Sequence, residues 1–205
     1  MRLYLASTSP ARLATLRAVG IDPIPIPSRV DEEAAVAGAG ALTPVGMVML
    51  LARLKAEAVA ESGAEFDGLI LGGDSAFEFE GEVYGKPHLP EVARRRWREQ
   101  RGRSGVLHSG HWLIDARSGI IGAAIGAPAA ATVRFAADIT DDEIDAYIAT
   151  GEPLEVAGAF TIDSKGAGFI EGVDGDPHAV VGLSVPLLRM LVRQLGIEWT
   201  DLWNR

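Results

Sequence analysis

The sequence predicts an α/β protein built around a mixed β-sheet. Short apolar runs that end in turn residues alternate along the 205-residue chain with stretches whose apolar side chains repeat at helical spacing. Such alternation is typical of a sheet whose strands are joined by helices. A hairpin pattern at residues 76–85 and a second half rich in strand patterns interrupt the alternation. We therefore expect a mixed sheet rather than a purely parallel one.

The first half of the chain contains clear start and stop signals. The segment RLYLAS predicts a buried strand at residues 2–7, and PARLATLRAVG predicts a helix that ends at Gly20. Three prolines in five residues predict an extended loop at 22–34 without regular structure. The remaining elements of this half are a helix from Thr43-Pro44 to Ser62-Gly63, a strand at 67–75, the hairpin at 76–85 and a helix from Pro90 to Gly102.

The second half contains more strand patterns. The segments GVLHSGHWLID, IIGAAIG and AAATVRFAAD predict three strands between residues 105 and 138. Thr140 and Glu143 form a capping-box pattern, which predicts a helix that ends at Gly151. VAGAFTI and GAGFIEGV predict two further strands, and Ser184 with Pro186 predicts the start of a closing helix.

Composition excludes several classes of protein. Hydrophobic residues make up 48% and charged residues 23% of the chain, ordinary values for a soluble globular protein. The net charge of −9 disfavours bulk attraction to nucleic acid or an anionic membrane, and the lack of cysteine excludes disulfides and zinc–thiolate sites. No apolar run approaches the roughly 20 residues that span a bilayer, and the start of the chain lacks a signal-peptide layout. We expect one cytoplasmic domain over residues 1–205, with two lobes and no separable linker.

Three further features have simple structural explanations. His108 and His111 show H-x-x-H spacing, but on a strand this spacing places the two rings on opposite faces, which disfavours a shared metal ion. Trp199 and Trp203 are expected either to pack the C-terminal tail onto the body or to contribute to a homodimer contact. A basic run is expected to be a solvated helix face with ion pairs to nearby glutamates, and it consists of Arg94, Arg95, Arg96, Arg98, Arg101 and Arg103.

The junction between the first predicted strand and helix has the features of an anion-binding site. Ser9 suits the N-cap and Pro10 the first helical position, so the strand leads directly into a helix N-terminus. Free backbone N–H groups and the positive end of the helix dipole attract anions there. Ser7 and Thr8 add hydroxyl donors, and Arg12 adds a forked cation. A capped helix after a strand is also common without any ligand, and that explanation stays open.

Acidic and basic residues elsewhere match a site for phosphate and metal. Asp74 follows the strand LILGG, where the carboxyl end of a strand would place it in the ligand crevice of an α/β sheet. Glu32 lies at the end of the proline loop, Lys55 lies on the long helix, and Lys86 lies in the turn GKP. Clustered carboxylates and cations suit a nucleotide phosphate and a divalent metal ion. Asp74 could equally be an acid that caps a loop.

Taken together, these residues resemble the Maf (septum formation inhibitor) family. Its motifs occur in order as LASTSPAR, VDEE, ARLKA, LGGDS, GKP, EIDAYIATGEPLEVAGAFTI and VVGLSVPLL, and the resemblance spans residues 3–195. It implies a mixed α/β fold like that of Maf and ITPase proteins, with two lobes around a central nucleotide cleft. It also implies hydrolysis of a nucleoside triphosphate to the monophosphate and pyrophosphate with Mg²⁺ or Mn²⁺.

The resemblance also implies roles for individual residues. Asp74 matches the catalytic acid that accepts a proton from the attacking water, and Glu32 matches the acid near the metal, to which Asp74 is also expected to bind. The positions that match phosphate contacts are Ser9, Arg12, Lys55 and Lys86.

Three positions depart from the family pattern and leave the substrate base open. Ala11, Ser75 and Asp163 match neither the branch that prefers dTTP and UTP nor the branch that acts on 7-methyl-GTP. By the family alignment, Asp163 faces the base edge. An ionised aspartate only accepts hydrogen bonds, so we expect the donor-rich edges of guanine or cytosine to be preferred over thymine and uracil.

Two alternatives to pyrophosphatase activity remain open from the sequence. One is a non-catalytic nucleotide-binding regulator of cell division, and the other is a phosphohydrolase that releases orthophosphate. The chain contains neither G-x-G-x-x-G after a strand nor G-x-x-x-x-G-K-[ST], which disfavours a dinucleotide-binding fold and a P-loop NTPase.

Overall fold

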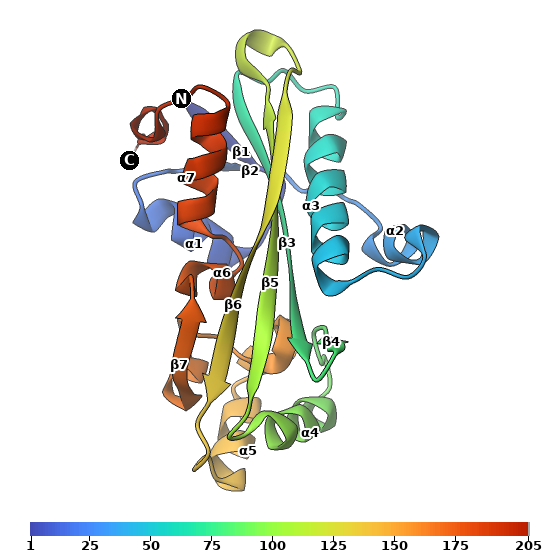
Figure 1. Ribbon diagram of the computed structural model, residues 1–205, viewed down its shortest axis with the longest axis vertical. Coiled ribbons are helices and arrows are strands. Elements are labelled where there is room, and N and C mark those ends of the chain that lie inside the picture. Colours follow the sequence, from blue (N-terminus) through green and yellow to red (C-terminus); the bar gives the residue numbers. More distant parts are fainter. Residues whose placement is uncertain (205) are drawn as a thin grey trace. The chain divides into compact units, whose positions relative to one another are not determined.

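The computed structural model describes residues 1–204 and contains one mixed sheet. The strands have the order β2-β1-β3-β5-β6-β7, and β4 pairs with β3 (Figure 1). β1 pairs in parallel with β2 and β3, whereas the β3–β4 and β6–β7 pairs are antiparallel. The prediction of an α/β fold with a mixed sheet is confirmed. The strands are β1 Arg2–Leu5, β2 Ile24–Pro25, β3 Gly68–Phe79, β4 Glu82–Tyr84, β5 Ser104–Asp115, β6 Ala124–Phe135 and β7 Ile170–Gly175.

Helices connect most of these strands, and the five helices that the sequence predicts begin where they are expected. Ser9, Thr43, Thr140 and Ser184 are all N-caps whose side chains accept a backbone hydrogen bond three residues later. The helices are α1 Pro10–Ala18, α2 Glu32–Ala39, α3 Pro44–Ala60, α4 Pro90–Gln100, α5 Asp141–Ala149, α6 Pro177–Val181 and α7 Val185–Gln194. None of the helices in the described part of the chain has the length and apolar character needed to cross a membrane.

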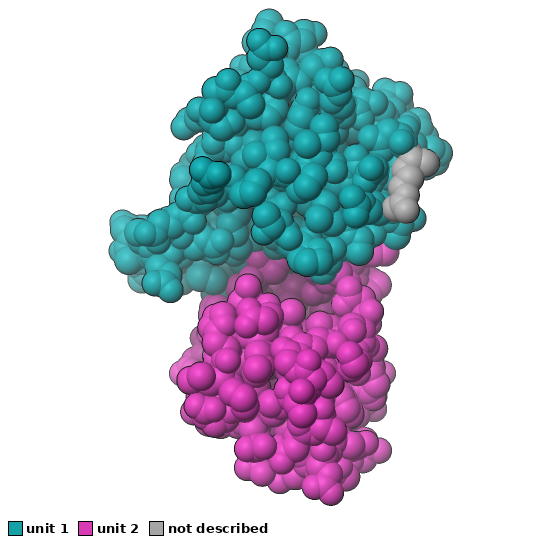
Figure 2. All heavy atoms as spheres, turned by 180° about the vertical axis from the view of Figure 1, so that it is seen from behind, with its two compact units in different colours: residues 1–74, 109–129, 182–205 teal, residues 75–108, 130–181 magenta. Residues whose placement is uncertain are grey.

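The chain divides into two compact units, which Figure 2 shows in different colours. Unit 1 comprises residues 1–74, 109–129 and 182–205, and unit 2 comprises residues 75–108 and 130–181. Strands β3, β5 and β6 each contribute residues to both units. Neither unit is therefore a contiguous piece of the chain.

Unit 1 is a three-layer arrangement because its strands alternate apolar side chains between two faces. Leu3 and Leu5 of β1 pack into a core with α1 and α7, whereas Tyr4 and Ala6 pack into a second core with α3. β3 follows the same alternation with Leu69 and Leu71 in the first core and Ile70 in the second core. Figure 1 shows α3 on one side of these strands and α1 and α7 on the other.

Unit 2 has an aromatic core. Trp97 of α4 is fully buried and makes edge-to-face contacts with Phe135, Tyr147 and Phe169, with ring centroids 5.4 to 5.5 Å apart. Such pairs add about 0.5–1.5 kcal/mol each beyond their buried area. The Trp97 Nε1–H donates to the Ala159 carbonyl oxygen at 2.8 Å, so the indole is satisfied inside the core.

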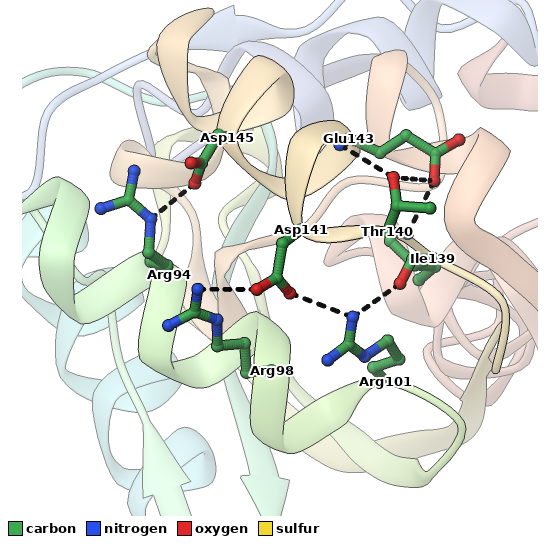
Figure 3. A network of polar contacts seen from close by, with 8 residues as sticks. All are labelled: Arg94, Arg98, Arg101, Ile139, Thr140, Asp141, Glu143 and Asp145. Carbon is green, nitrogen blue, oxygen red and sulfur yellow. Dashed lines mark hydrogen bonds and ion pairs between the residues drawn. The ribbon is translucent and has the colours of Figure 1, made fainter.

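The arginine run on α4 is neutralised within unit 2. Arg94 donates to Asp145, and Arg98 and Arg101 both donate to Asp141 of α5 (Figure 3). The expected ion pairs to nearby glutamates include that of Arg95 with Glu99 at 3.9 Å, whereas the partners of Arg94, Arg98 and Arg101 are aspartates of α5. These pairs are solvent-exposed, so each contributes little to the stability of the fold.

The prediction of an extended loop without regular structure at 22–34 is wrong. This segment contains β2, and the next residue, Ile26, donates its N–H to the Leu5 carbonyl oxygen. The segment then leads into α2, whose N-cap is Asp31. β2 lies at the end of the sheet order, a position that tolerates proline because only one side of an edge strand pairs.

Four strand predictions in the second half also need correction. Residues 120–126 and 129–138 were expected to form separate strands, but one strand, β6, covers Ala124–Phe135. The segment VAGAFTI is not a strand, because Gly158 and Ala159 both have positive φ values, 72° and 63°. Their carbonyl oxygens accept hydrogen bonds from Gln100 and Trp97 of α4, which holds this turn in place. GAGFIEGV is half correct, since β7 begins at Ile170.

The remaining aromatic and histidine residues have structural partners. Trp199 packs against the unit 1 core, and the indole of Trp203 lies over Gly20, so both tryptophans pack the C-terminal tail onto unit 1. His108 lies 2.7 Å from Glu78 through Nε2, whereas His111 Nε2 accepts the Ser184 N–H at 2.8 Å. The Nε2 atoms of the two histidines therefore have different partners.

Candidate active site

The turn between β1 and α1 has the conformation that the sequence predicts. Ser9 caps α1 and accepts the Arg12 N–H at 3.4 Å, with Pro10 at the first helical position. The Ser7 hydroxyl oxygen accepts the Ser9 N–H at 3.1 Å, which tightens the turn. The N-terminus of α1 therefore follows immediately after the end of β1, as an anion site at a helix N-terminus requires.

Arg12 is buried beneath this turn. Its Nε donates to the Gly182 carbonyl oxygen at 2.9 Å, and its NH1 donates to Ser7 Oγ at 3.3 Å. A Cβ atom at Gly73 would lie 3.4 Å from Arg12 Nε. The guanidinium of Arg12 therefore packs against the backbone of β3 at Gly73, which has no side chain. Burial lowers the pKa of Arg12, although the nearby carboxylates of Asp74 and Glu32 oppose this shift.

Lys55 links two carboxylates from different elements. Its Nζ lies 2.7 Å from Asp74 Oδ1 and 2.8 Å from Glu32 Oε1. The side chains of Lys55 and Asp74 are 10% and 12% exposed, whereas Glu32 is 51% exposed. We call Glu32, Lys55 and Asp74 the lysine–carboxylate centre.

Strand alternation and a missing side chain bring this centre together. Asp74 has the same parity along β3 as Ile70, whose side chain lies in the α3 core, and so Asp74 faces α3. A Cβ atom at Gly72 would lie 2.0 Å from the Ala52 carbonyl oxygen of α3. Only glycine permits this approach, which places Lys55, one turn further along α3, beside Asp74.

Burial raises the pKa of the Asp74 carboxyl, and the charges of Lys55 and Arg12 partly oppose this rise. A carboxylate with a raised pKa is a better proton acceptor than an exposed aspartate. The centre therefore contains a buried carboxylate whose negative charge is balanced by the ammonium group of Lys55.

Two positional predictions are corrected here. Asp74 does not follow the end of a strand but lies within β3, which continues to Phe79. Glu32 does not end a loop but begins α2, where Asp31 is the N-cap. Both residues still contact Lys55, because it is the face of β3 and the position of α2 that bring the carboxylates together.

The predicted site residues are distributed over both units. Ser9, Arg12, Glu32, Lys55 and Asp74 belong to unit 1. The other three predicted residues belong to unit 2. Ser75 follows Asp74 in β3, whereas Lys86 and Asp163 are exposed and lie outside the strands and helices. No group of three or more metal-binding side chains occurs in the described residues.

Sequence reasoning did not single out Glu152 of unit 2, which is the most heavily hydrogen-bonded carboxylate of the motif EIDAYIATGEPLEVAGAFTI. Four groups donate to it, from Tyr147, Thr161, Ser164 and Gly166. The only signal in the sequence is a Glu-Pro pair directly after the glycine that ends α5. That signal does not distinguish a binding residue from a turn residue.

Comparison with models of protein families shows which family the chain belongs to. A family model described as "Maf-like protein" matches residues 2–195. The chain belongs to the Maf family. The resemblance noted from the sequence motifs is thus confirmed over residues 2–195 of this Maf protein.

Curated relatives of this Maf protein carry a common name. A protein of Leifsonia xyli subsp. xyli named nucleoside triphosphate pyrophosphatase is 68% identical, and the match covers 100% of this chain and 98% of the relative. Proteins with the same name from Saccharopolyspora erythraea and Streptomyces coelicolor are each 48% identical, with 100% and 98% of this chain and 98% and 94% of the relatives covered. Among solved structures, that of the Staphylococcus aureus Ham1 protein aligns with a TM-score of 0.48 at 13% identity and covers 95% of this chain and 100% of that chain.

Proposed function

We propose that this Maf protein is a hydrolase that converts a nucleoside triphosphate to the monophosphate and pyrophosphate. The observation that carries the proposal is the lysine–carboxylate centre, in which Lys55 lies 2.7 Å from the buried Asp74. The shared name of its curated relatives, nucleoside triphosphate pyrophosphatase, supports the same reaction. The turn before α1 supplies the anion-binding features that a triphosphate requires.

Asp74 acts as the general base in this proposal. It accepts a proton from a water molecule while the water oxygen bonds to a phosphorus of the α–β anhydride link. The bond between that phosphorus and the bridging oxygen breaks, and the electron pair stays on the bridging oxygen of the departing group, which is pyrophosphate if the α-phosphorus is attacked and the nucleoside monophosphate if the β-phosphorus is attacked. Lys55 balances the charge of Asp74 before the reaction, and Ser9, Arg12 and Lys86 bind the phosphates. General-base catalysis typically contributes about 10²–10⁴-fold to the rate.

A divalent metal ion fits the donor set of the centre. Glu32 and Asp74 are the two residues that would hold Mg²⁺ or Mn²⁺, because Mg²⁺ is commonly bound by one or two carboxylates together with substrate phosphates. When bound, the ion would neutralise charge that develops on the phosphate oxygens. Lys55 Nζ occupies the point between Glu32 Oε1 and Asp74 Oδ1, so the ion would be held by the other oxygen of each carboxylate.

The substrate base is proposed to be guanine or cytosine, including modified forms. Asp163 is exposed and carries an acceptor-only carboxylate, and Ser75 is proposed to contact the base as well. A thymine or uracil carbonyl that faces this carboxylate would cost roughly 1–3 kcal/mol, or about 5- to 150-fold in kcat/KM. We expect Asp163→Gln to narrow or reverse the preference, measured as kcat/KM for GTP, CTP, UTP and dTTP. Wild-type preference for UTP or dTTP would contradict this assignment.

One product assay tests the reaction. Purified protein is incubated with a panel of nucleotides and Mg²⁺ or Mn²⁺, and the products are separated. Monophosphate with pyrophosphate supports the proposal. Diphosphate with orthophosphate indicates the phosphohydrolase alternative, and binding without turnover indicates the non-catalytic regulator.

A further inference from the structure

One carboxylate in unit 2 closes a short segment of the chain onto itself. Glu152 Oε1 accepts hydrogen bonds from Tyr147 Oη at 2.9 Å, Thr161 Oγ1 at 2.6 Å and the Gly166 N–H at 3.2 Å. Its second oxygen, Oε2, accepts from Ser164 Oγ at 2.8 Å. Three of these four donors belong to residues 161–166, which we call the clasped segment.

The clasped segment is tight as well as hydrogen-bonded. A Cβ atom at Gly166 would lie 2.5 Å from the Thr161 carbonyl oxygen and 2.6 Å from the Tyr147 hydroxyl oxygen. Burial favours a neutral Glu152, but the hydrogen bonds from Thr161, Ser164 and Tyr147 outweigh it and lower the pKa of Glu152 to about 2. Glu152 is therefore an ionised acceptor throughout the neutral range, and it holds both ends of the segment.

Asp163 lies inside the clasped segment, between two of the residues that Glu152 binds. Its neighbours Thr161 and Ser164 are held through their side chains, while Asp163 itself is exposed and available to a ligand. Fixing the residues of a free loop carries a cost in conformational entropy, and a segment that is ordered before binding avoids that cost at the moment of recognition.

We infer that Glu152 is a positioning residue that holds the clasped segment and, through it, the carboxylate of Asp163, and that it thereby sets base selectivity. The inference rests on the proposed function, in which Asp163 faces the base. Glu152 does not touch the substrate in this scheme. It acts by fixing where an acceptor lies, since selectivity built on hydrogen bonds requires the acceptor to stay in place.

The test is a competition between two nucleotides in one tube. GTP and UTP are mixed at equal concentration with wild-type protein or a variant, and the two monophosphates are quantified together. The product ratio gives the ratio of the two kcat/KM values. Because both substrates meet the same enzyme molecules, a smaller folded fraction lowers both products equally and leaves the ratio unchanged. A purely structural role for Glu152 therefore cannot move this readout.

We expect Glu152→Gln to bring the GTP:UTP ratio about tenfold closer to one, because the amide keeps the shape but replaces one acceptor oxygen with a donor. Ser164→Ala removes one hydrogen bond and should move the ratio in the same direction by a smaller factor. Glu155→Gln is the matched control from the same turn, since the side chain of Glu155 is 69% exposed and its ion pair is with the similarly exposed His88, at 3.7 Å. Its ratio should equal that of the wild type.

The outcomes separate this inference from the proposed function. A wild-type ratio near one, or an unchanged ratio in Glu152→Gln, overturns the inference while turnover to pyrophosphate still supports the proposed function. Absence of wild-type turnover on any nucleotide overturns both. If Glu152→Gln does not fold, the Ser164→Ala ratio decides, and a wild-type value there overturns the inference.

Discussion

Replacing Lys55 with methionine tests the lysine–carboxylate centre directly. Methionine keeps most of the volume and the apolar stem but removes the ammonium group that lies 2.7 Å from Asp74 and 2.8 Å from Glu32. At this distance two unit charges attract by about 6 kcal/mol at an effective dielectric constant of about 20. Part of this is offset because Lys55 no longer has to be desolvated, and breaking a buried pair typically costs about 3–5 kcal/mol.

We expect the free energy of unfolding to fall by an amount near the lower end of that range, because Glu32 is half exposed and water can solvate it once Lys55 is gone. A loss of about 3 kcal/mol corresponds to a Tm lower by about 6–12 °C for a chain of this size. The loss should depend on pH. Without Lys55 the pKa of Asp74, already raised by burial, rises further, and a group whose pKa is higher in the folded state stabilises the fold at low pH and loses that contribution as pH rises.

Thermal unfolding followed by circular dichroism at pH 5 and pH 8 measures both effects. The Tm difference between wild type and Lys55→Met should be larger at pH 8, where Asp74 would be ionised without a partner. Arg53→Met on the same helix is the control, since its pair with Glu57 is exposed at 3.8 Å and contributes at most about 1 kcal/mol. A Tm loss that is equal at the two pH values would refute the assignment of a buried, charge-dependent pair.

Three further outcomes follow from the same structure. Asp74→Asn should lower kcat by about 10²–10⁴-fold without changing the circular dichroism spectrum, and near-normal turnover would make Asp74 a structural acid. Removal of divalent ions with EDTA should stop turnover, and added Mg²⁺ or Mn²⁺ should restore it; activity that persists in EDTA contradicts a metal held by Glu32 and Asp74. Gly72→Ala should destabilise the fold by about 1–3 kcal/mol in urea unfolding, since its Cβ would meet the Ala52 carbonyl oxygen at 2.0 Å, whereas Gly38→Ala, with open space around it, should not.

The helix starts could be predicted from the sequence because capping is local. Ser9, Thr140 and Ser184 bind backbone groups only three residues away, so the pattern and the structure contain the same information. The ends of β3 and β6 could not be predicted in this way. Strand length depends on pairing with residues far away in the chain, and both strands continue through the glycine, proline or acidic residues that suggested their ends.

The candidate site was predicted as a set of residues but not as an arrangement. Residue type and neighbouring turns pointed to Glu32, Lys55 and Asp74 one by one. Their meeting at one nitrogen atom depends on how closely α3 approaches β3, which the spacing of the sequence does not encode. Glu152 was missed for a related reason, since its donors lie on either side of it in turns that no periodic pattern describes.

The division of unit 1 into three separate stretches of chain has a consequence for synthesis on the ribosome. All residues of unit 2 are translated before residues 182–205, whereas the core that contains Leu3 and Leu5 is completed only by Leu188, Leu191 and Leu202. The apolar face of β1 that contains Leu3 and Leu5 is therefore fully covered only after the last segment of the chain has been synthesised. A chain that ends before α7 would leave this face uncovered, with the side chains of Leu3 and Leu5 exposed to solvent.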